Sequence, residues 1–195
     1  VLIFLEVIEM NHKTKTLTAV GTLCALAYAA TAVGRIPLIL FLKYDPKDII
    51  IATGGFLFGP LAAGSIALLV SLAEMLTISE NGVLGFLMNV ISSSSFACTA
   101  AFIYRKKRTF PAAVTGLLCG WGAMVSVMML WNYLIAPIYM GCSREEVVRL
   151  LLPAFLPFNL IKGGLNAAGV LLVYRPVITA LVRSHLVEAG QGTRG

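Results

Sequence analysis

The chain has 195 residues, of which 58% are apolar and 12% are charged, and its formal net charge is +6. A soluble domain is typically about 45–50% apolar and about 25% charged, so this composition excludes an ordinary water-soluble protein. The basic residues stand in short segments between long apolar runs and form no continuous stripe. This distribution argues against nucleic acid as a partner and is typical of the loops of a membrane protein.

The apolar runs predict helices that cross a lipid bilayer. Residues 84–104 and 112–140 are almost continuously apolar, whereas the strands of a transmembrane barrel alternate apolar and polar residues over about 10 positions. Because lipid offers no hydrogen-bond partners, a spanning segment must satisfy its own backbone, as a helix does. The predicted fold class is therefore an all-α integral membrane protein with one transmembrane domain.

Six transmembrane helices are predicted in chain order. Residues 1–15 are a cytoplasmic lead, and residues 1–9 are left out of the prediction because Met10 offers a second start of the chain. Pro37 and Pro46 interrupt helix, so residues 36–47 are predicted as a structured loop. The predicted spans are residues 16–34, 48–58, 61–78, 83–104, 110–140 and 145–181, the second of them short and the last broken near Pro153 and Pro157. Residues 184–195 are predicted to form a flexible tail.

The charges between the spans predict the orientation. With six spans, the basic residues fall mainly on one side: Lys13, Lys15, Arg105, Lys106, Lys107, Arg108, Arg175 and Arg183. The other side holds most of the acidic residues: Asp45, Asp48, Glu80, Glu145 and Glu146. Positively charged loops stay in the cytoplasm. Both termini are therefore predicted to be cytoplasmic in a multi-pass protein of the bacterial inner membrane, with the loops at 36–47, 79–82 and 141–146 facing outward.

Polar side chains inside the spans are candidates for function, because they are costly in lipid. They are Glu74, Asn89, Asn132, Asn159, Lys162 and Asn166. Asn159, Lys162 and Asn166 are spaced by three and four residues, so they share one helix face. Two interpretations stay open: these groups join helices by hydrogen bonds, or they line a pocket for a small molecule. Lys162 either pairs with Glu74 or donates to a ligand.

Other features point to no chemistry of the chain's own. The four cysteines lack CxxC spacing, so no metal site is predicted, and no cofactor either. The chain has no phosphate-binding loop, so energy for uphill transport must come from another subunit. Ala25 and Ala29 form a small-xxx-small pattern on the first span, which serves either packing within the monomer or docking of a partner.

Three sequence motifs occur in the order expected of a known family. Residues 41–50 read Phe-Leu-Lys-Tyr-Asp-Pro-Lys-Asp-Ile-Ile, and residues 54–62 read Gly-Gly-Phe-Leu-Phe-Gly-Pro-Leu-Ala. Asn132 and Tyr133 stand near the end of the fifth span, and residues 156–163 read Leu-Pro-Phe-Asn-Leu-Ile-Lys-Gly. Together these motifs resemble the substrate-binding S components of energy-coupling factor (ECF) transporters, and most closely the riboflavin-specific group.

The resemblance implies a six-helix bundle that binds a vitamin, here riboflavin, from outside the cell. It also implies three partners: a transmembrane coupling protein and two cytoplasmic ATPase subunits. Matched to the motifs of the family, three polar residues would bind the ligand: Asn132, Asn159 and Lys162. The residues of the first outer loop would line the site of the flavin ring: Leu40, Phe41, Leu42 and Lys43. Glu74 and Asn89 complete the predicted set of substrate-binding residues, and Ala25 and Ala29 would dock on the coupling protein.

Three other hypotheses remain beside riboflavin uptake. The chain is an S component for another small molecule, a structural membrane protein, or an integral-membrane enzyme that uses Glu74 and Lys162 as acid and base. An enzyme would need further catalytic groups that converge on the cavity, and the sequence offers none. The prediction is therefore a transport subunit and not an enzyme.

Overall fold

The fold, obtained as a computed structural model, describes residues 2–39, 42–78 and 82–183. Its elements are α1 (Leu2–Gly34), β1 (Ile36–Ile39), β2 (Leu42–Tyr44), α2 (Lys47–Phe58), α3 (Pro60–Thr77), α4 (Gly82–Lys107), α5 (Phe110–Met140), α6 (Arg144–Leu150), the π-helix η1 (Leu151–Phe155) and α7 (Leu156–Arg183). Among these residues, 5 helices are long and apolar enough to cross a membrane. This confirms a helical, multi-pass architecture.

The predicted second span, α2, is shorter than a helix that crosses the hydrocarbon core on its own. It has 12 residues, which correspond to about 18 Å at 1.5 Å per residue, whereas the hydrocarbon core is about 30 Å thick. The helix ends at Gly59, whose φ of +93° suits a residue without a Cβ. Pro60 then opens α3, where its missing N–H is not needed.

The fold is not purely helical, because the predicted loop after α1 contains a β-hairpin. Strands β1 and β2 pair antiparallel, with Ile36 opposite Tyr44 and Pro37 opposite Lys43. Pro37 has no N–H and cannot continue α1, so the chain turns into extended backbone. The hairpin ends just before α2 and brings Tyr44 and Asp45 into the interior, where both are buried.

The bounds of two other helices, α1 and α4, also differ from the prediction. Helix α1 begins at Leu2, although the first 15 residues were predicted as a lead, because an apolar segment precedes the span and extends the helix. Helix α4 runs three residues beyond the predicted end, through its basic cluster to Lys107. The predicted tail at 184–195 and most of the predicted turn at 79–82 lie outside the described residues.

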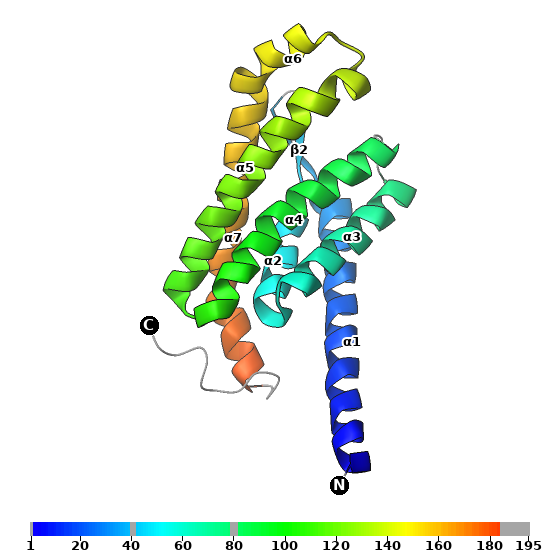
Figure 1. The fold of residues 1–195 in the computed structure, drawn as a ribbon, viewed down its shortest axis with the longest axis vertical. Helices are drawn as coiled ribbons and strands as arrows, with labels where there is room; N and C mark the ends of the chain where they lie inside the picture. Colours follow the sequence, from blue (N-terminus) through cyan, green and yellow to red (C-terminus); the bar gives the residue numbers. More distant parts are fainter. Residues whose placement is uncertain (1, 40–41, 79–81, 184–195) are drawn as a thin grey trace.

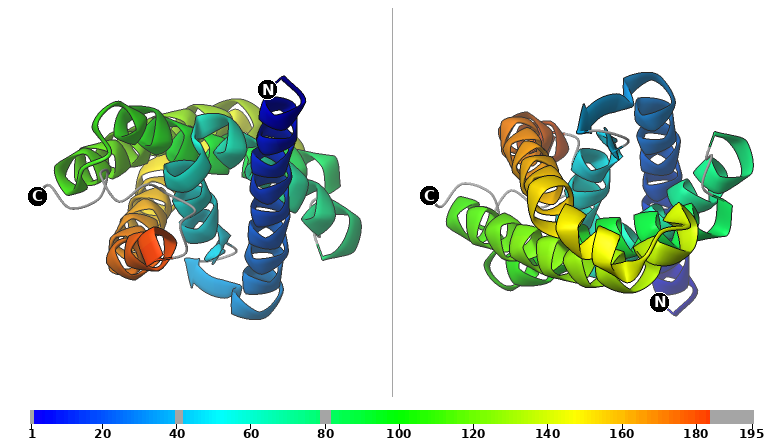
Figure 2. Two further views of the ribbon diagram at one scale, coloured as in Figure 1. Left: turned by 90° about the horizontal axis from the view of Figure 1, so that it is seen from below. Right: turned by 90° about the horizontal axis from the view of Figure 1, so that it is seen from above.

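The short helix α2 occupies the centre of the bundle. It contacts α1, α3, α4 and α7, and the views along the molecule show it between α1 and α7 (Figure 2). Its buried residues Ile51, Ala52 and Phe56 belong to the main hydrophobic core. The beginning of α1 and the end of α7 lie at the same end of the molecule, opposite α6 (Figure 1).

Glycines allow the longest helices to pack closely. A Cβ at Gly120 of α5 would collide with the carbonyl oxygen of Phe96, and one at Gly116 would lie 2.6 Å from the carbonyl oxygen of Ala100. Gly163 of α7 similarly accommodates the ring of Trp121. Such small residues let helix backbones approach each other in a membrane.

The last predicted span is broken where its prolines predicted a break. Pro153 lies within the π-helix η1, between α6 and α7. Proline cannot donate a backbone hydrogen bond, and wider π-type turns commonly accommodate such interruptions. The break separates the short helix α6 from α7, and Phe155 of η1 faces the interior with 0% of its surface exposed.

Candidate binding site

A cavity of about 410 Å³ lies between the hairpin, α4, α5 and the start of α7. This volume is within the range of about 300–1,000 Å³ that is common for small-molecule sites. One part of its lining is apolar: Leu42, Leu84, Gly85, Met88, Met128, Met140, Phe155 and Phe158. The other part is polar: Arg35, Lys43, Asp45, Asn89, Ser92, Asn132, Asn159 and Lys162. The cavity therefore suits a ligand with both an apolar body and several polar groups.

Three polar residues that the sequence singled out meet at this cavity. Asn132 comes from α5, and Asn159 and Lys162 come from α7; all three are buried and line the cavity. Asn132 donates to the carbonyl oxygen of Met128 over 2.8 Å, and Asn159 donates to that of Phe155 over 2.8 Å. Each amide is thereby held by its own helix, one turn back, so its orientation is set before a ligand binds.

Lys162 is held by two polar groups at the cavity wall. Its ammonium nitrogen lies 3.2 Å from Oδ2 of Asp48 and donates to the hydroxyl of Ser92 over 3.2 Å. Of the two alternatives left open for Lys162, a direct pairing with Glu74 is therefore not the contact that the structure shows. Glu74 instead accepts two short hydrogen bonds from Lys47, at 2.7 and 2.6 Å. Because α2 contacts both α3 and α7, Glu74 of α3 meets Lys47 of α2, and Lys162 of α7 meets Asp48 of α2.

Six charged side chains form one network beside and behind the cavity. Three are cations, Arg35, Lys47 and Lys162, and three are anions, Asp45, Asp48 and Glu74. Arg35 lies 2.8 Å from Asp45 and 3.7 Å from Glu74, and Lys47 lies 4.0 Å from Asp45. The formal charges of the six sum to zero. This balance reduces the cost of keeping them out of water, since each buried charge has an opposite partner.

The remaining predicted site residues differ in where they lie. Leu42, Lys43 and Asn89 line the cavity. Glu74 does not; it lies behind the wall with 0% of its surface exposed and accepts a 3.0 Å hydrogen bond from Asn89. Leu40 and Phe41 lie outside the described residues.

The predicted docking residues lie away from the cavity. Ala25 and Ala29 are exposed on α1. Only 11% of the most apolar stretch of this helix is buried within the protein. The alternative interpretation, packing inside the monomer, is therefore wrong for both residues. Their neighbour Ala27, on the opposite face of the helix, is the one that packs in the core.

Tyr44 connects the hairpin to the same network. Its hydroxyl donates to Oδ1 of Asn166 over 2.9 Å, and Asn166 in turn donates to Asp48 over 3.1 Å. Burial, followed by the charges of Asp48 and Asp45, raises the pKa of Tyr44 to about 12. The phenol therefore stays protonated at neutral pH and keeps donating, which fixes the end of the hairpin against α7.

Several lining residues were not found from the sequence. Arg35 was not singled out and Asp45 was used only to predict the orientation, yet both line the cavity and bind each other. Ser92 and the lining methionines were not among the candidate residues from the sequence, yet they line the cavity too. A usable signal existed in Lys47 and Asp48, two adjacent opposite charges at the start of an apolar helix, because both had to find partners within the bundle.

Comparisons with known proteins agree with this architecture. Residues 15–174 match the family described as "ECF transporter, substrate-specific component". The chain is 28% identical over 180 residues to the riboflavin transporter RibU of Staphylococcus aureus (strain TCH60), covering 88% of this chain and 95% of that protein. It is 29% identical over 132 residues to the riboflavin transporter FmnP of Bacillus subtilis (strain 168), covering 63% of this chain and 70% of that protein.

A solved structure is similar over almost its whole length. It is described as the S component of a bacterial ECF transporter, and it covers 87% of this chain and 98% of its own chain with a TM-score of 0.74 at 28% identity. The family match, the helical bundle and this structural similarity lead to one conclusion. The chain belongs to the family of substrate-specific components of ECF transporters.

Proposed function

We propose that this protein captures riboflavin, or a closely related flavin, from outside the cell and delivers it through an ECF transporter. Two relatives named as riboflavin transporters support the choice of vitamin. The observation that carries the proposal is the composition of the cavity, where an apolar wall rich in methionine and phenylalanine faces Asn132, Asn159 and Lys162.

The cavity lining matches the chemistry of a flavin. The flavin ring is flat and largely apolar, which suits contacts with methionine sulfur and phenylalanine rings. Its edge carries carbonyl oxygens and an N–H, and its side chain carries hydroxyls. Asparagine both donates and accepts hydrogen bonds, while lysine only donates. Asn159 and Lys162 on one helix and Asn132 on another offer these groups from two sides.

Titration of riboflavin into the purified protein tests this proposal. Asn159→Ala, Asn132→Ala and Lys162→Met are each expected to weaken binding about 10- to 100-fold, since a lost hydrogen bond to a buried partner costs about 1–3 kcal/mol. Quenching of flavin fluorescence measures the affinity. Ser126→Ala serves as a control, because its hydroxyl bonds to its own helix at Gly122 and is exposed. Unchanged affinity in all three cavity variants would contradict the proposed site.

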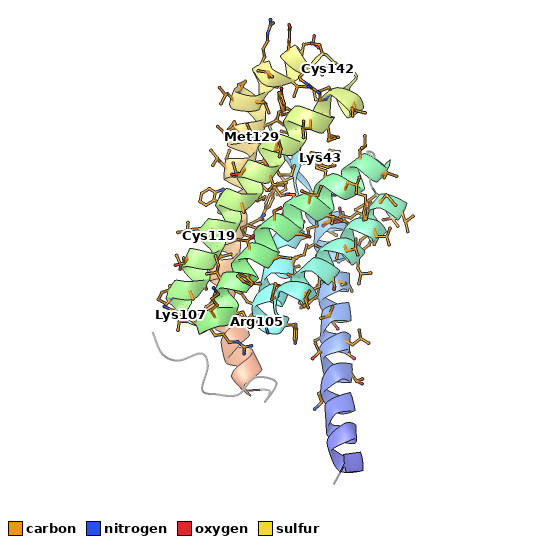
Figure 3. The ribbon with its side chains drawn as sticks, in the orientation of Figure 1. Lys43, Arg105, Lys107, Cys119, Met129 and Cys142 are labelled. Carbon is orange, nitrogen blue, oxygen red and sulfur yellow. The ribbon has the colours of Figure 1, made fainter. Side chains whose placement is uncertain are left out.

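We also propose six passages through the membrane, with the short helix α2 counted as the second of them and both termini in the cytoplasm. Five helices meet the requirements for a span, and the start of α1 and the end of α7 lie at one end of the molecule (Figure 1). An even number of passages is needed for this arrangement. Arg105 and Lys107 lie at the end of α4 away from Lys43 of the hairpin (Figure 3). The positive-inside rule then puts the cavity mouth outside.

Labelling of single cysteines in a cysteine-free variant tests the orientation. Lys107→Cys is expected to resist a membrane-impermeant reagent applied to intact cells, whereas Asn81→Cys is expected to react. Permeabilised cells serve as the control, in which both positions must react. The reverse pattern in intact cells would contradict the proposed orientation.

Delivery is proposed to require an ECF coupling protein and two ATPase subunits, which dock through the exposed alanines of α1. No enzymatic activity is proposed. Glu74 and Lys162, the pair considered as acid and base, have separate partners, and Glu74 does not line the cavity. A reaction at the cavity would therefore lack the pair of groups that the enzyme hypothesis requires.

A further inference from the structure

Asp48 is a fully buried carboxylate with partners on two other helices. Oδ1 accepts a 2.5 Å hydrogen bond from the hydroxyl of Ser93 on α4. Oδ2 accepts from the side-chain nitrogen of Asn166 on α7 over 3.1 Å and lies 3.2 Å from the ammonium of Lys162. Asp48 itself does not line the cavity. Any effect of this carboxylate on a ligand must therefore pass through another residue.

Lys162 is the residue through which Asp48 can act. Lysine carries three N–H donors on a flexible stem and loses about 2 kcal/mol of rotamer entropy when it is fixed. Within the described residues, two of these donors have partners, Asp48 and Ser92. The third remains for a ligand in the cavity that Lys162 lines. The carboxylate thus determines where the ammonium sits before a ligand arrives.

Asp48 is held firmly enough to serve this purpose. Ser93 on α4 and Asn166 on α7 each fix one of its two oxygens. Asn166 is in turn fixed by the hydroxyl of Tyr44. A carboxylate with fixed oxygens presents one position for the ammonium of Lys162, whereas a mobile carboxylate would let it move.

We propose that Asp48 is a positioning residue of the binding site, which acts by holding the ammonium of Lys162 at the cavity wall. This inference rests on the proposed function, because riboflavin is the ligand whose affinity reports it. Asp48 is an anchor on the central helix α2, and Lys162 is the ligand-binding group. A purely structural ion pair would stabilise the fold without acting on the ligand. The positioning role instead predicts that Asp48 affects riboflavin affinity only when Lys162 is present.

Riboflavin titration of Asp48→Asn, Lys162→Met and the double variant tests this role. Asp48→Asn is expected to weaken binding about tenfold or more, because it removes the charge that orients the ammonium. In the double variant, the loss is expected to equal that of Lys162→Met alone, since Asp48 acts through Lys162. Tyr174→Phe is the control: it removes a buried hydrogen bond to Tyr104, outside the cavity lining, and is expected to bind as the wild type does.

Two outcomes overturn the proposal. One is wild-type affinity for riboflavin in Asp48→Asn. The other is a double variant whose fold-loss of affinity is the product of the two single fold-losses, which would mean that the two residues act independently. Thermal unfolding of the same four proteins without ligand separates this test from the proposed function. If the wild type fails to bind riboflavin, the proposed function is contradicted, but the melting temperatures still test the contact between Asp48 and Lys162. Additive decreases in melting temperature in the double variant overturn that contact. A double variant more stable than Asp48→Asn supports it.

Discussion

Lys47→Met is expected to lower the free energy of unfolding by about 3–5 kcal/mol, which is the usual cost of removing one partner of a buried ion pair. Lys47 and Glu74 are both 0% exposed, and the ammonium contacts both carboxylate oxygens of Glu74. Within the part of the chain that the structure describes, the side chain of Glu74 then keeps Asn89 at 3.0 Å and Arg35 at 3.7 Å. Its charge would then be poorly compensated in the interior of the bundle.

Lys47 lies at a position that is unfavourable for a cation. The residue begins α2, where the positive end of the helix dipole disfavours a cation. Only a strong local partner such as Glu74 explains why a lysine is fully buried there. Replacing both residues, as in Lys47→Met with Glu74→Met, is therefore expected to recover most of the lost stability, because no uncompensated charge remains.

Denaturant unfolding in detergent micelles, followed by tryptophan fluorescence, measures these stabilities. Lys106→Met is the matched control, because Lys106 is exposed at the end of α4, and it is expected to change stability by no more than about 0.5 kcal/mol. A Lys47→Met protein as stable as this control would show that the ion pair contributes nothing to the packing of α2 against α3.

Ala25→Trp and Ala29→Trp are expected to abolish riboflavin uptake by cells while leaving riboflavin binding by the purified protein intact. Both alanines are exposed on α1, and neither lines the cavity. A small-residue face allows the backbone of a partner helix to approach closely, and a tryptophan would hold the two apart. Loss of docking removes the ATPases from the cycle, so the expected loss of transport is complete and not partial.

Uptake of labelled riboflavin and fluorescence titration of the purified variants measure the two activities separately. Ala168→Trp is the control, because it places the same side chain on an exposed alanine of α7; it is expected to leave both activities unchanged. Normal uptake by both α1 variants would mean that these alanines only face lipid. Loss of binding would mean that α1 also shapes the cavity.

The sequence alone determined the class of the fold and one inward-facing set of residues on α7. Continuous apolar runs predict spanning helices because a helix is the structure that satisfies its backbone in lipid. The spacing of Asn159, Lys162 and Asn166 predicted one shared face of α7, and all three are buried. Pro153 marked the break between α6 and α7. These features are local, so they are visible in a short stretch of sequence.

Only the tertiary structure decided which charges pair and which side chains meet at the cavity. Asp48 and Asn166 are 118 residues apart in the chain, and Lys47 and Glu74 are 27 apart. Periodicity gives the face on which a side chain lies, but not the helix that packs against that face. The sequence thus indicated that Lys162 needs a partner and left Glu74 and a ligand as the candidates, because it could not place Asp48 of α2 beside α7. Opposite charges in a bundle pair with whichever partner packing brings within a few ångströms, since Coulomb attraction falls with distance.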